Sequence, residues 1–240
     1  MLLDLHAHSS GISRCCKIPA PAVLEVSRDL GLDGIVLTNH YQKSYVKDGT
    51  PRELAERYVA EYHYTRECGE KIGQKVFFGI EVTTELYPKV HMLVYGVPES
   101  FIIENPEVYD LTQEELYRLV KAAGGTLIQA HPFRGGTTPL DLAWLDGVEI
   151  NCHPLYGTSC FPELTKIATD ARLILTCGGD YHADTYRANC GTYLPDTVID
   201  SVALGEYIRS TDVIRFRMQE PNREEINEVT YTRGVGAVIG

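Results

Sequence analysis

Histidine and carboxylate side chains recur in this chain at the ends of short apolar runs. They are His6, His8, His40, Glu81, His131, Asp180 and His182. His6 and His8 are two residues apart on an extended segment, so both point to the same side and can bind one ion. Imidazole with carboxylate suits Zn²⁺, Mn²⁺ or Fe²⁺, whereas an all-oxygen set favours Mg²⁺ or Ca²⁺. There are more imidazoles than one ion can use, so we predict two or three divalent ions that share a bridging carboxylate.

A cluster of this kind has a defined chemistry. Two-metal sites activate a water molecule and stabilise both the attacking and the leaving oxygen of a phosphoryl displacement. Two divalent ions outweigh the negative charges of Glu81 and Asp180, so the pocket is cationic within an anionic protein. These charges predict a small phosphorylated substrate rather than a long polyanion.

The composition limits the class of protein. The chain has 240 residues, 44% of them hydrophobic and 23% charged, which is typical of a globular protein. The formal net charge of −11 repels phosphates at long range and disfavours long nucleic acid as a partner. No apolar run could span a bilayer, and the first residues do not resemble a signal peptide. The 7 cysteines lack CxxC spacing, which indicates reduced thiols. We therefore expect a cytoplasmic protein that is not bound to membranes. The sequence gives no indication of its oligomeric state.

Short apolar runs alternate with longer amphipathic stretches, as in repeated strand–helix units. Strands are expected at Leu2–Leu5, Gly34–Thr38, Val76–Val82, Val90–Tyr95, Thr126–Ala130, Val148–Ile150 and Arg172–Thr176. Helices are expected at Pro19–Leu30, Pro51–Ile72, from the capping box Thr112–Glu115 to Gly124, and at Pro139–Leu145 and Phe161–Asp170. This α/β pattern predicts a parallel sheet covered by helices, either a nearly closed (β/α) barrel or an open doubly wound sheet.

The polar residues would share one rim of such a barrel, because the C-terminal ends of parallel strands lie together there. Asn151 follows the sixth run and would join them. His91 is the exception because it lies at the start of its run. If that run is antiparallel, paired by a turn through Leu86–Lys89, His91 returns to the same rim.

Together these motifs resemble the polymerase and histidinol phosphatase (PHP) superfamily. The matching segments, in the expected order, are Asp4-Leu5-His6-Ala7-His8-Ser9, Thr38-Asn39-His40, Gly79-Ile80-Glu81, His91-Met92-Leu93-Val94, Ala130-His131-Pro132 and Gly179-Asp180-Tyr181-His182. The resemblance implies a distorted (β/α)7 barrel with a di- or trinuclear metal site at the C-terminal rim that hydrolyses phosphoesters. We expect residues 1–220 to form a single PHP-like domain, and residues 221–240 to form a tail that is packed on the barrel or partly mobile.

Carried over residue by residue, the resemblance implies three metal positions. The first would be held by His6, His8, Glu81 and Asp180. Glu81 would bridge to a second ion, held with His91 and His131. The third would be held by His40 and His182.

The chain departs from the superfamily pattern at the third position. Relatives commonly carry Asp or His five or six residues after the second histidine of the first motif, where this chain has Ser13 and Arg14. Serine is a poor ligand and arginine cannot be one, which leaves water, Cys15 or substrate phosphate to complete the site. We hypothesise that Arg14 points into the pocket and binds phosphate through its planar fork.

Roles beyond metal binding are assigned by residue chemistry. The predicted catalytic residues are Asp180, His182 and Arg14, and the leaving group takes its proton either from His182 or from water on a metal ion. The predicted substrate-binding residues are Arg14, Arg134, Arg187 and Asn151. His63 and His153 are expected to be surface or hydrogen-bonded histidines.

Two other functions fit parts of the pattern. Amidohydrolase-type C–N hydrolases also begin with HxH after the first strand, but they typically carry Lys on a middle strand and a single late Asp. Here Glu81 ends a middle strand and His182 accompanies Asp180, which favours phosphoester hydrolysis. A non-catalytic metal-binding regulatory module is favoured by the altered third position and disfavoured by the nearly complete ligand set.

Overall fold

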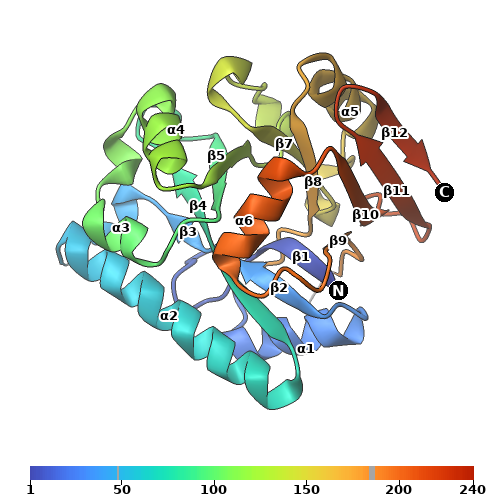
Figure 1. Ribbon diagram of the computed structural model, residues 1–240. Helices are drawn as coiled ribbons and strands as arrows, with labels where there is room; N and C mark the ends of the chain where they lie inside the picture. Colours follow the sequence, from blue (N-terminus) through green and yellow to red (C-terminus); the bar gives the residue numbers. More distant parts are fainter. Residues whose placement is uncertain (48, 184–186) are drawn as a thin grey trace.

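The structure is a computed structural model that describes residues 1–47, 49–183 and 187–240 (Figure 1). Its helices are α1 (Ala20–Asp29), α2 (Pro51–Ile72), α3 (Ser100–Glu104), α4 (Gln113–Ala122), α5 (Phe161–Asp170) and α6 (Ser201–Ser210). Its strands are β1 (Leu2–Ala7), β2 (Gly34–Leu37), β3 (His40–Tyr41), β4 (Lys75–Thr83), β5 (His91–Tyr95), β6 (Thr126–Gln129), β7 (Gly147–Asn151), β8 (Ile174–Gly178), β9 (Gly191–Tyr193), β10 (Val213–Gln219), β11 (Ile226–Thr232) and β12 (Gly236–Ile239).

Helix ends follow local signals in the sequence. Both α2 and α4 begin with a capping box, in which Thr50 pairs with Glu53 and Thr112 pairs with Glu115. Gly73 ends α2 in the left-handed conformation, with φ of 75°. The helices predicted at α1, α2, α4 and α5 are confirmed. Among the described residues, no helix has the length and apolar character needed to cross a membrane.

The helix expected at Pro139–Leu145 is wrong. Only a single 3₁₀ turn, Leu142–Trp144, forms there. The side chain of Asp141 accepts a hydrogen bond from the N–H of Ala143 and starts the turn. Strand β7 begins at Gly147, so there is no room for further helical turns.

A single sheet connects the described strands in the order β12-β11-β10-β9-β1-β2-β4-β5-β6-β7-β8, and β3 pairs with β4. The pairs β1–β2, β2–β4, β6–β7 and β7–β8 are parallel. β5 is antiparallel to both its neighbours and places His91 opposite Thr83, so the predicted reversal of this run is confirmed. Residues 226–239 form β11 and β12 of an antiparallel extension.

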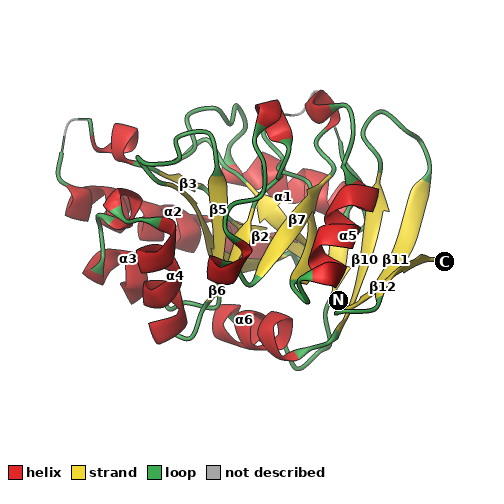
Figure 2. Ribbon diagram, turned by 90° about the horizontal axis from the view of Figure 1, so that it is seen from above, coloured by secondary structure: helices red, strands yellow, loops and turns green. Residues whose placement is uncertain are grey.

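The sheet curls into a half-barrel with helices on its outer side (Figures 1 and 2). At one end β8 approaches β1, where the N–H of Asp180 donates to the carbonyl of His6 at 2.8 Å. Ala7 and Tyr181 form an isolated parallel bridge at the same place. The predicted α/β class is confirmed. Regular strand–helix alternation is broken because β5 reverses direction and β10, β11 and β12 follow one another without a helix.

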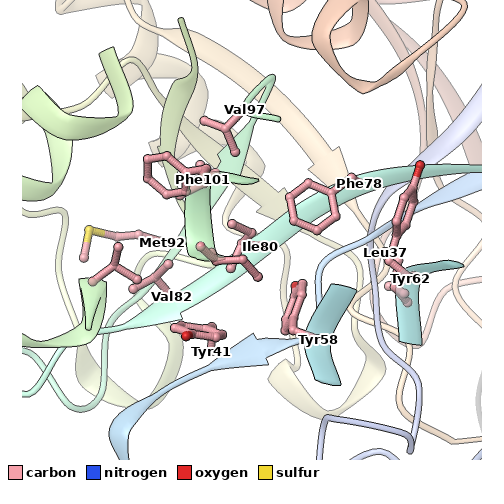
Figure 3. Packing of buried hydrophobic residues seen from close by; sticks show 14 of the residues in the cluster. Leu37, Tyr41, Tyr58, Tyr62, Phe78, Ile80, Val82, Met92, Val97 and Phe101 are labelled. Carbon is pink, nitrogen blue, oxygen red and sulfur yellow. The ribbon is translucent and has the colours of Figure 1, made fainter. Parts of the chain in front are cut away.

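Aromatic side chains fill the space between α2 and the sheet (Figure 3). Tyr58 on α2 is 1% exposed and lies edge-on to Phe78 of β4. Its buried hydroxyl donates to the carbonyls of Asn39 and Gly79, at 2.9 and 2.8 Å. Burying an aromatic side chain of this size contributes about 2 kcal/mol. The Tyr58 hydroxyl also ties the segment just before His40 to strand β4.

Strands β5 and β6 carry histidines at one end, and helix α6 packs against their other end (Figure 1). The hydroxyl of Ser201 accepts the N–H of Phe78 at 2.7 Å. Gly205 lies against Gly96, and a Cβ on Gly205 would come within 2.3 Å of the Gly96 Cα atom. Glycine is therefore required where the helix crosses the strand end. The histidine-bearing end is left uncovered by α6.

Candidate metal centre

The eight predicted metal ligands converge at one end of the half-barrel. They are contributed by β1 and its end (His6, His8), β3 (His40), β4 (Glu81), β5 (His91), the residue after Ala130 at the end of β6 (His131), and the segment after β8 (Asp180, His182). Within each of four overlapping groups, the possible ligand atoms lie within 4.8 Å of one another; these are His6-His8-Asp180, His6-Glu81-His131, His40-Glu81-His91 and His8-His40-His182. We call these eight residues the histidine–carboxylate cluster.

Glu81 lies at the centre of this cluster. It is fully buried, and its two oxygens face five imidazoles from four different strand segments. The distances from Glu81 to the imidazole nitrogens are 2.5 Å for His40, 2.8 Å for His91, 3.2 Å for His131, and 3.4 Å for both His6 and His8. A carboxylate in this position can bridge two ions.

The spacing of the donor atoms fits divalent metal ions. His6 Nε2 lies 3.0 Å from His8 Nε2, and His8 Nε2 lies 3.1 Å from Asp180 Oδ1. Ligands on a tetrahedral ion with bonds of about 2.0 Å are about 3.3 Å apart. His40 Nδ1 and Glu81 Oε2 are both buried and face each other at 2.5 Å, and neither has a hydrogen-bond partner outside the cluster within the described part of the chain. Buried donors that face one another without other hydrogen-bond partners are what an ion-binding site requires.

Buried partners orient the rings of the first two histidines. His6 Nδ1 donates to Glu149 Oε1 at 2.8 Å. The Ser13 hydroxyl donates to Asn39 Oδ1, so it accepts from His8 Nδ1 at 3.0 Å. These partners orient both rings with Nε2 toward the cluster, as metal binding through Nε2 requires.

Sequence reasoning missed the roles of Glu149 and Ser13. Glu149 is buried on β7, where its second oxygen accepts the N–H of His131 and the side-chain amide of Asn151. The available signal was the two-residue spacing of Glu149 and Asn151, which places both side chains on the same face of the strand.

The backbone is strained at two of the predicted ligands. His131 and Asp180 have φ of 32° and 52°, in the left-handed region that non-glycine residues rarely adopt. Gly178, two residues before Asp180, leaves space for the ion pair of His6 and Glu149. A Cβ at Gly178 would lie 2.4 Å from Glu149 Oε1 and 2.5 Å from His6 Cβ.

Opposite charges determine the protonation of the two carboxylates. Burial raises the pKa of Glu81, but His40 and the other imidazoles outweigh burial and hold the pKa well below its usual range. Burial likewise opposes charge on Asp180, and His6 contributes most to keeping its pKa low. Burial lowers the pKa of His8 well below its usual range, which favours the neutral form that binds metal.

Of the three arginines that were predicted to bind phosphate, Arg134 lies at the cluster. Its guanidinium is 3.2 Å from His131 Nε2 and 3.7 Å from Asp180 Oδ2. It stacks on the ring of Tyr156 at 4.5 Å, and the Tyr156 hydroxyl donates to Asp180 Oδ2 at 2.9 Å. Asn151 lines the adjacent cavity of about 360 Å³ together with Arg134 and Tyr156. Tyr156 was not singled out from the sequence.

The other predicted arginines make contacts elsewhere. Arg14 donates to the carbonyls of Ser44 and Tyr45 and stacks on the Tyr45 ring. Arg187 pairs with Asp29 of α1 at 3.4 Å. Their predicted phosphate contacts would require these side chains to move.

His63 and His153, which were not predicted to be metal ligands, lie in different surroundings. His63 on α2 pairs with Glu99 at 2.7 Å and is partly exposed. His153 is buried and stacks on Tyr156 at 4.6 Å, next to the cavity, and its Nδ1 accepts the N–H of Leu155.

Neither family models nor curated proteins match this chain. Solved structures do match. A two-domain protein from Bacteroides vulgatus, described as containing a predicted PHP-like metal-dependent phosphoesterase, has a TM-score of 0.58 at 17% identity, over 97% of this chain and 65% of that one. A protein from Bifidobacterium adolescentis named "putative metal-dependent phosphoesterase" has a TM-score of 0.53 at 18% identity, over 88% and 96% of the two chains. An amidohydrolase from Chromobacterium violaceum, with bound sulfate and no metal, has a TM-score of 0.51 at 15% identity, over 81% and 92%.

These comparisons establish the fold. The resemblance to PHP-like metal-dependent phosphoesterases, predicted from the motifs, is confirmed at the level of the fold. This chain spans less than two thirds of the length of the B. vulgatus protein.

Proposed function

We propose that the protein is a metal-dependent phosphoesterase that cleaves a small phosphate ester at a site for two or three Zn²⁺, Mn²⁺ or Fe²⁺ ions. The observation that carries this proposal is the contact of buried Glu81 with five imidazoles. The bridge between Ala7 and Tyr181 supports the finer inference that β1, β2 and β4–β8 form a distorted seven-stranded barrel.

The chain's own residues would divide the work. Divalent ions, when bound, supply Lewis-acid stabilisation and lower the pKa of water. His6, His8, His40, Glu81, His91, His131, Asp180 and His182 would hold these ions. Arg134 lies beside the cluster with its fork available for phosphate oxygens, and Asn151 lines the same cavity. Tyr156 holds Asp180 in place through its hydroxyl.

The leaving group would take its proton either from His182, in a state where that ring does not hold an ion, or from water. The His182 Nδ1 donates to the carbonyl of Asp180 at 2.7 Å, so a role as ligand or acid would fall to Nε2. The ring is partly exposed and lies 4.2 Å from that of His8, centroid to centroid. A partly open position at the cluster is what a substrate needs to reach the reacting groups.

The substrate class follows from charge. The net charge of −11 disfavours long nucleic acid, whereas the metal-loaded cluster beside Arg134 attracts a compact anion. The cavity of about 360 Å³ next to the cluster suits a small molecule.

A C–N hydrolase is the second candidate, because one matching structure is named an amidohydrolase. The protein should be stripped with a chelator and reloaded with Zn²⁺, Mn²⁺ or Fe²⁺. Each form should then be assayed on p-nitrophenyl phosphate, bis-p-nitrophenyl phosphate and a panel of amides and lactones. We expect metal-dependent release of p-nitrophenol.

The matched variants are His8→Ala in the cluster and His63→Ala on the surface of α2. We expect the first to abolish hydrolysis and the second to retain it. Faster cleavage of amides or lactones would favour the C–N hydrolase. Metal binding without any hydrolysis would favour a regulatory module.

A further inference from the structure

The cavity beside Arg134 is lined in part by a loop that a distant segment of the chain holds in place. Residues 152–160 connect β7 to α5 and contribute Leu155, Tyr156 and Ser159 to the cavity wall. Residues 220–225 connect β10 to β11 and make hydrogen bonds to this loop near both of its ends. We call these two segments the cavity loop and the β10–β11 turn.

Glu220 makes the first of these attachments. Ser159, which is 3% exposed, donates its N–H to Glu220 Oε2 at 3.1 Å and its hydroxyl to Glu220 Oε1. The Ser159 hydroxyl also accepts the N–H of Phe161, the first residue of α5, at 3.2 Å. Hydrogen bonds to a carboxylate are roughly twice as strong as those between neutral groups. Glu220 therefore fixes the end of the cavity loop where the chain enters α5.

Asn222 makes the second attachment. Its side-chain amide donates to the carbonyl of Pro154 at 3.0 Å. Asn222 has φ of 61°, in the left-handed region that asparagine adopts more readily than most other residues. Pro154 and Ser159 lie on either side of Tyr156 in the sequence. The two attachments therefore hold the part of the cavity loop that carries Tyr156.

Tyr156 connects the cavity loop to the cluster. Its ring lies against the Arg134 guanidinium at 4.5 Å and stacks on His153 at 4.6 Å, and its hydroxyl donates to Asp180 Oδ2 at 2.9 Å. Arg134 also contacts His131 and Asp180, but both are predicted metal ligands, and bound ions would compete for them. The Tyr156 ring is not a ligand and stays available. Its position therefore determines where the Arg134 fork lies.

Backbone strain is concentrated around the same cavity. Among the described residues, six that are not glycine have positive φ, and five of these belong to this region. They are His131, Phe133 and Cys160 in the cavity wall, Asp180 in the cluster, and Asn222. Such conformations persist only where the surrounding structure holds them, and they occur preferentially at functional sites. The hydrogen bonds of the β10–β11 turn are part of the structure that holds them.

We propose that Glu220 and Asn222 are positioning residues for substrate binding. They hold the cavity loop so that Tyr156 keeps the Arg134 fork directed at the phosphate group. This rests on the proposed function, because it assumes that a phosphate ester binds beside the cluster. Neither residue touches the reacting atoms, so their loss should weaken substrate binding more than it slows the chemical step.

The first experiment compares Glu220→Ala with Glu224→Ala, a substitution at an exposed position of the same turn. With saturating metal and p-nitrophenyl phosphate, Glu220→Ala should raise KM about tenfold and change kcat by less than about twofold, because hydrogen bonds to a charged group contribute on this scale. Glu224→Ala should match the wild type. Glu220→Gln keeps one carbonyl acceptor for Ser159 and should recover part of the loss. Asn222→Ala removes one neutral hydrogen bond and should raise KM about threefold.

The second experiment tests whether Glu220 acts through Arg134. In the Arg134→Ala background, Glu220→Ala should change KM by less than about twofold, because the side chain that it helps to place is absent. Hydrogen exchange of a peptide covering residues 153–160, followed by mass spectrometry, gives a readout that does not depend on activity. Exchange there should be faster in Glu220→Ala than in the wild type and Glu224→Ala.

The outcomes separate this inference from the proposed function. If the wild type hydrolyses p-nitrophenyl phosphate but Glu220→Ala leaves either KM or the exchange of the cavity loop unchanged, the positioning role is wrong and the phosphoesterase proposal stands. The same holds if Glu220→Ala lowers kcat alone, or raises KM equally with and without Arg134. If the wild type hydrolyses no phosphate ester in any metal-loaded form, both proposals are overturned. If Glu220→Ala does not fold, Glu220→Gln and Asn222→Ala supply the same measurements.

Discussion

The histidine–carboxylate cluster and the thiols of Cys152, Cys177 and Cys190 are both buried groups of side chains that could bind metal. The three thiols lie within 4.8 Å of one another, as do the possible ligand atoms within each of the four groups of the histidine–carboxylate cluster. Cys152 Sγ and Cys177 Sγ are 3.5 Å apart, and all three thiols are no more than 1% exposed. We call these three residues the cysteine cluster.

The two clusters differ in what surrounds them. The histidines are oriented by buried hydrogen-bond partners such as Glu149 and Ser13. The cysteine cluster is embedded in an apolar core with residues such as Leu5 and Leu175, and burial raises the pKa of the Cys177 thiol well above its usual range. Hydrogen bonds of Cys177 and Cys190 lower the pKa of the Cys152 thiol to about 5, so the three thiols are not equivalent. Buried free cysteines otherwise behave as small apolar side chains. Proximity of donors is therefore a weaker sign of a metal site than the partners that orient them and an opening to solvent.

The largest expected effect is that of Glu81→Gln. The amide loses the charge that offsets two ions and cannot bridge them as a carboxylate does. We expect the rate of the proposed phosphoesterase reaction to fall by a factor of about 1,000 or more and bound metal to decrease. Metal content and hydrolysis of p-nitrophenyl phosphate measure both effects.

The control for Glu81→Gln is Glu67→Gln on the exposed face of α2, which should retain wild-type metal content and rate. Retention of full activity by Glu81→Gln would mean that the cluster is not the catalytic centre.

Removal of metal should lower the stability of the folded protein. An ion that binds only the folded state at about 100 times its Kd stabilises it by about 3 kcal/mol. Thermal unfolding with and without chelator measures the difference. The variant Cys177→Ala should show the same metal-dependent shift as the wild type, since the cysteine cluster is not expected to bind the ion. A shift that vanished in Cys177→Ala would reverse the assignment of the two clusters.

Most of the histidine–carboxylate cluster could be predicted from the sequence because its members directly follow apolar runs. Strand periodicity then brings them to one end of the sheet. His91 could be included because a short turn allows its strand to reverse. Such patterns depend only on the local backbone.

The sequence could not predict the contacts of long side chains. Arg134 lies at the cluster, while Arg14 stacks on Tyr45, because loop geometry decides where a flexible arginine reaches. The strands β11 and β12 were also missed. β11 has only two fully buried apolar side chains, Val229 and Tyr231, so its alternation is a weak signal.

Glu149→Gln tests the orienting partners directly. The amide is a weaker acceptor for His6 Nδ1 and carries no charge, so His6 becomes a poorer ligand. We expect metal affinity to fall by about 10- to 100-fold, with activity recovering at high metal concentration. Glu163→Gln on α5, which is exposed, is the matched control. Loss of activity that excess metal does not restore would indicate that Glu149 acts in the reaction itself.

The smallest expected effect is that of Cys177→Ala. The substitution removes one buried sulfur from the apolar core and should lower the free energy of unfolding by about 1 kcal/mol, as for loss of a buried group of similar size. Metal content and the rate of the proposed phosphoesterase reaction should equal those of the wild type, because no ion is assigned to the cysteine cluster. Denaturant unfolding and metal analysis of the same sample measure both quantities. A loss of one ion per chain, together with a much larger loss of stability, would show that buried thiols without orienting partners do bind metal here, and that the distinction between the two clusters is wrong.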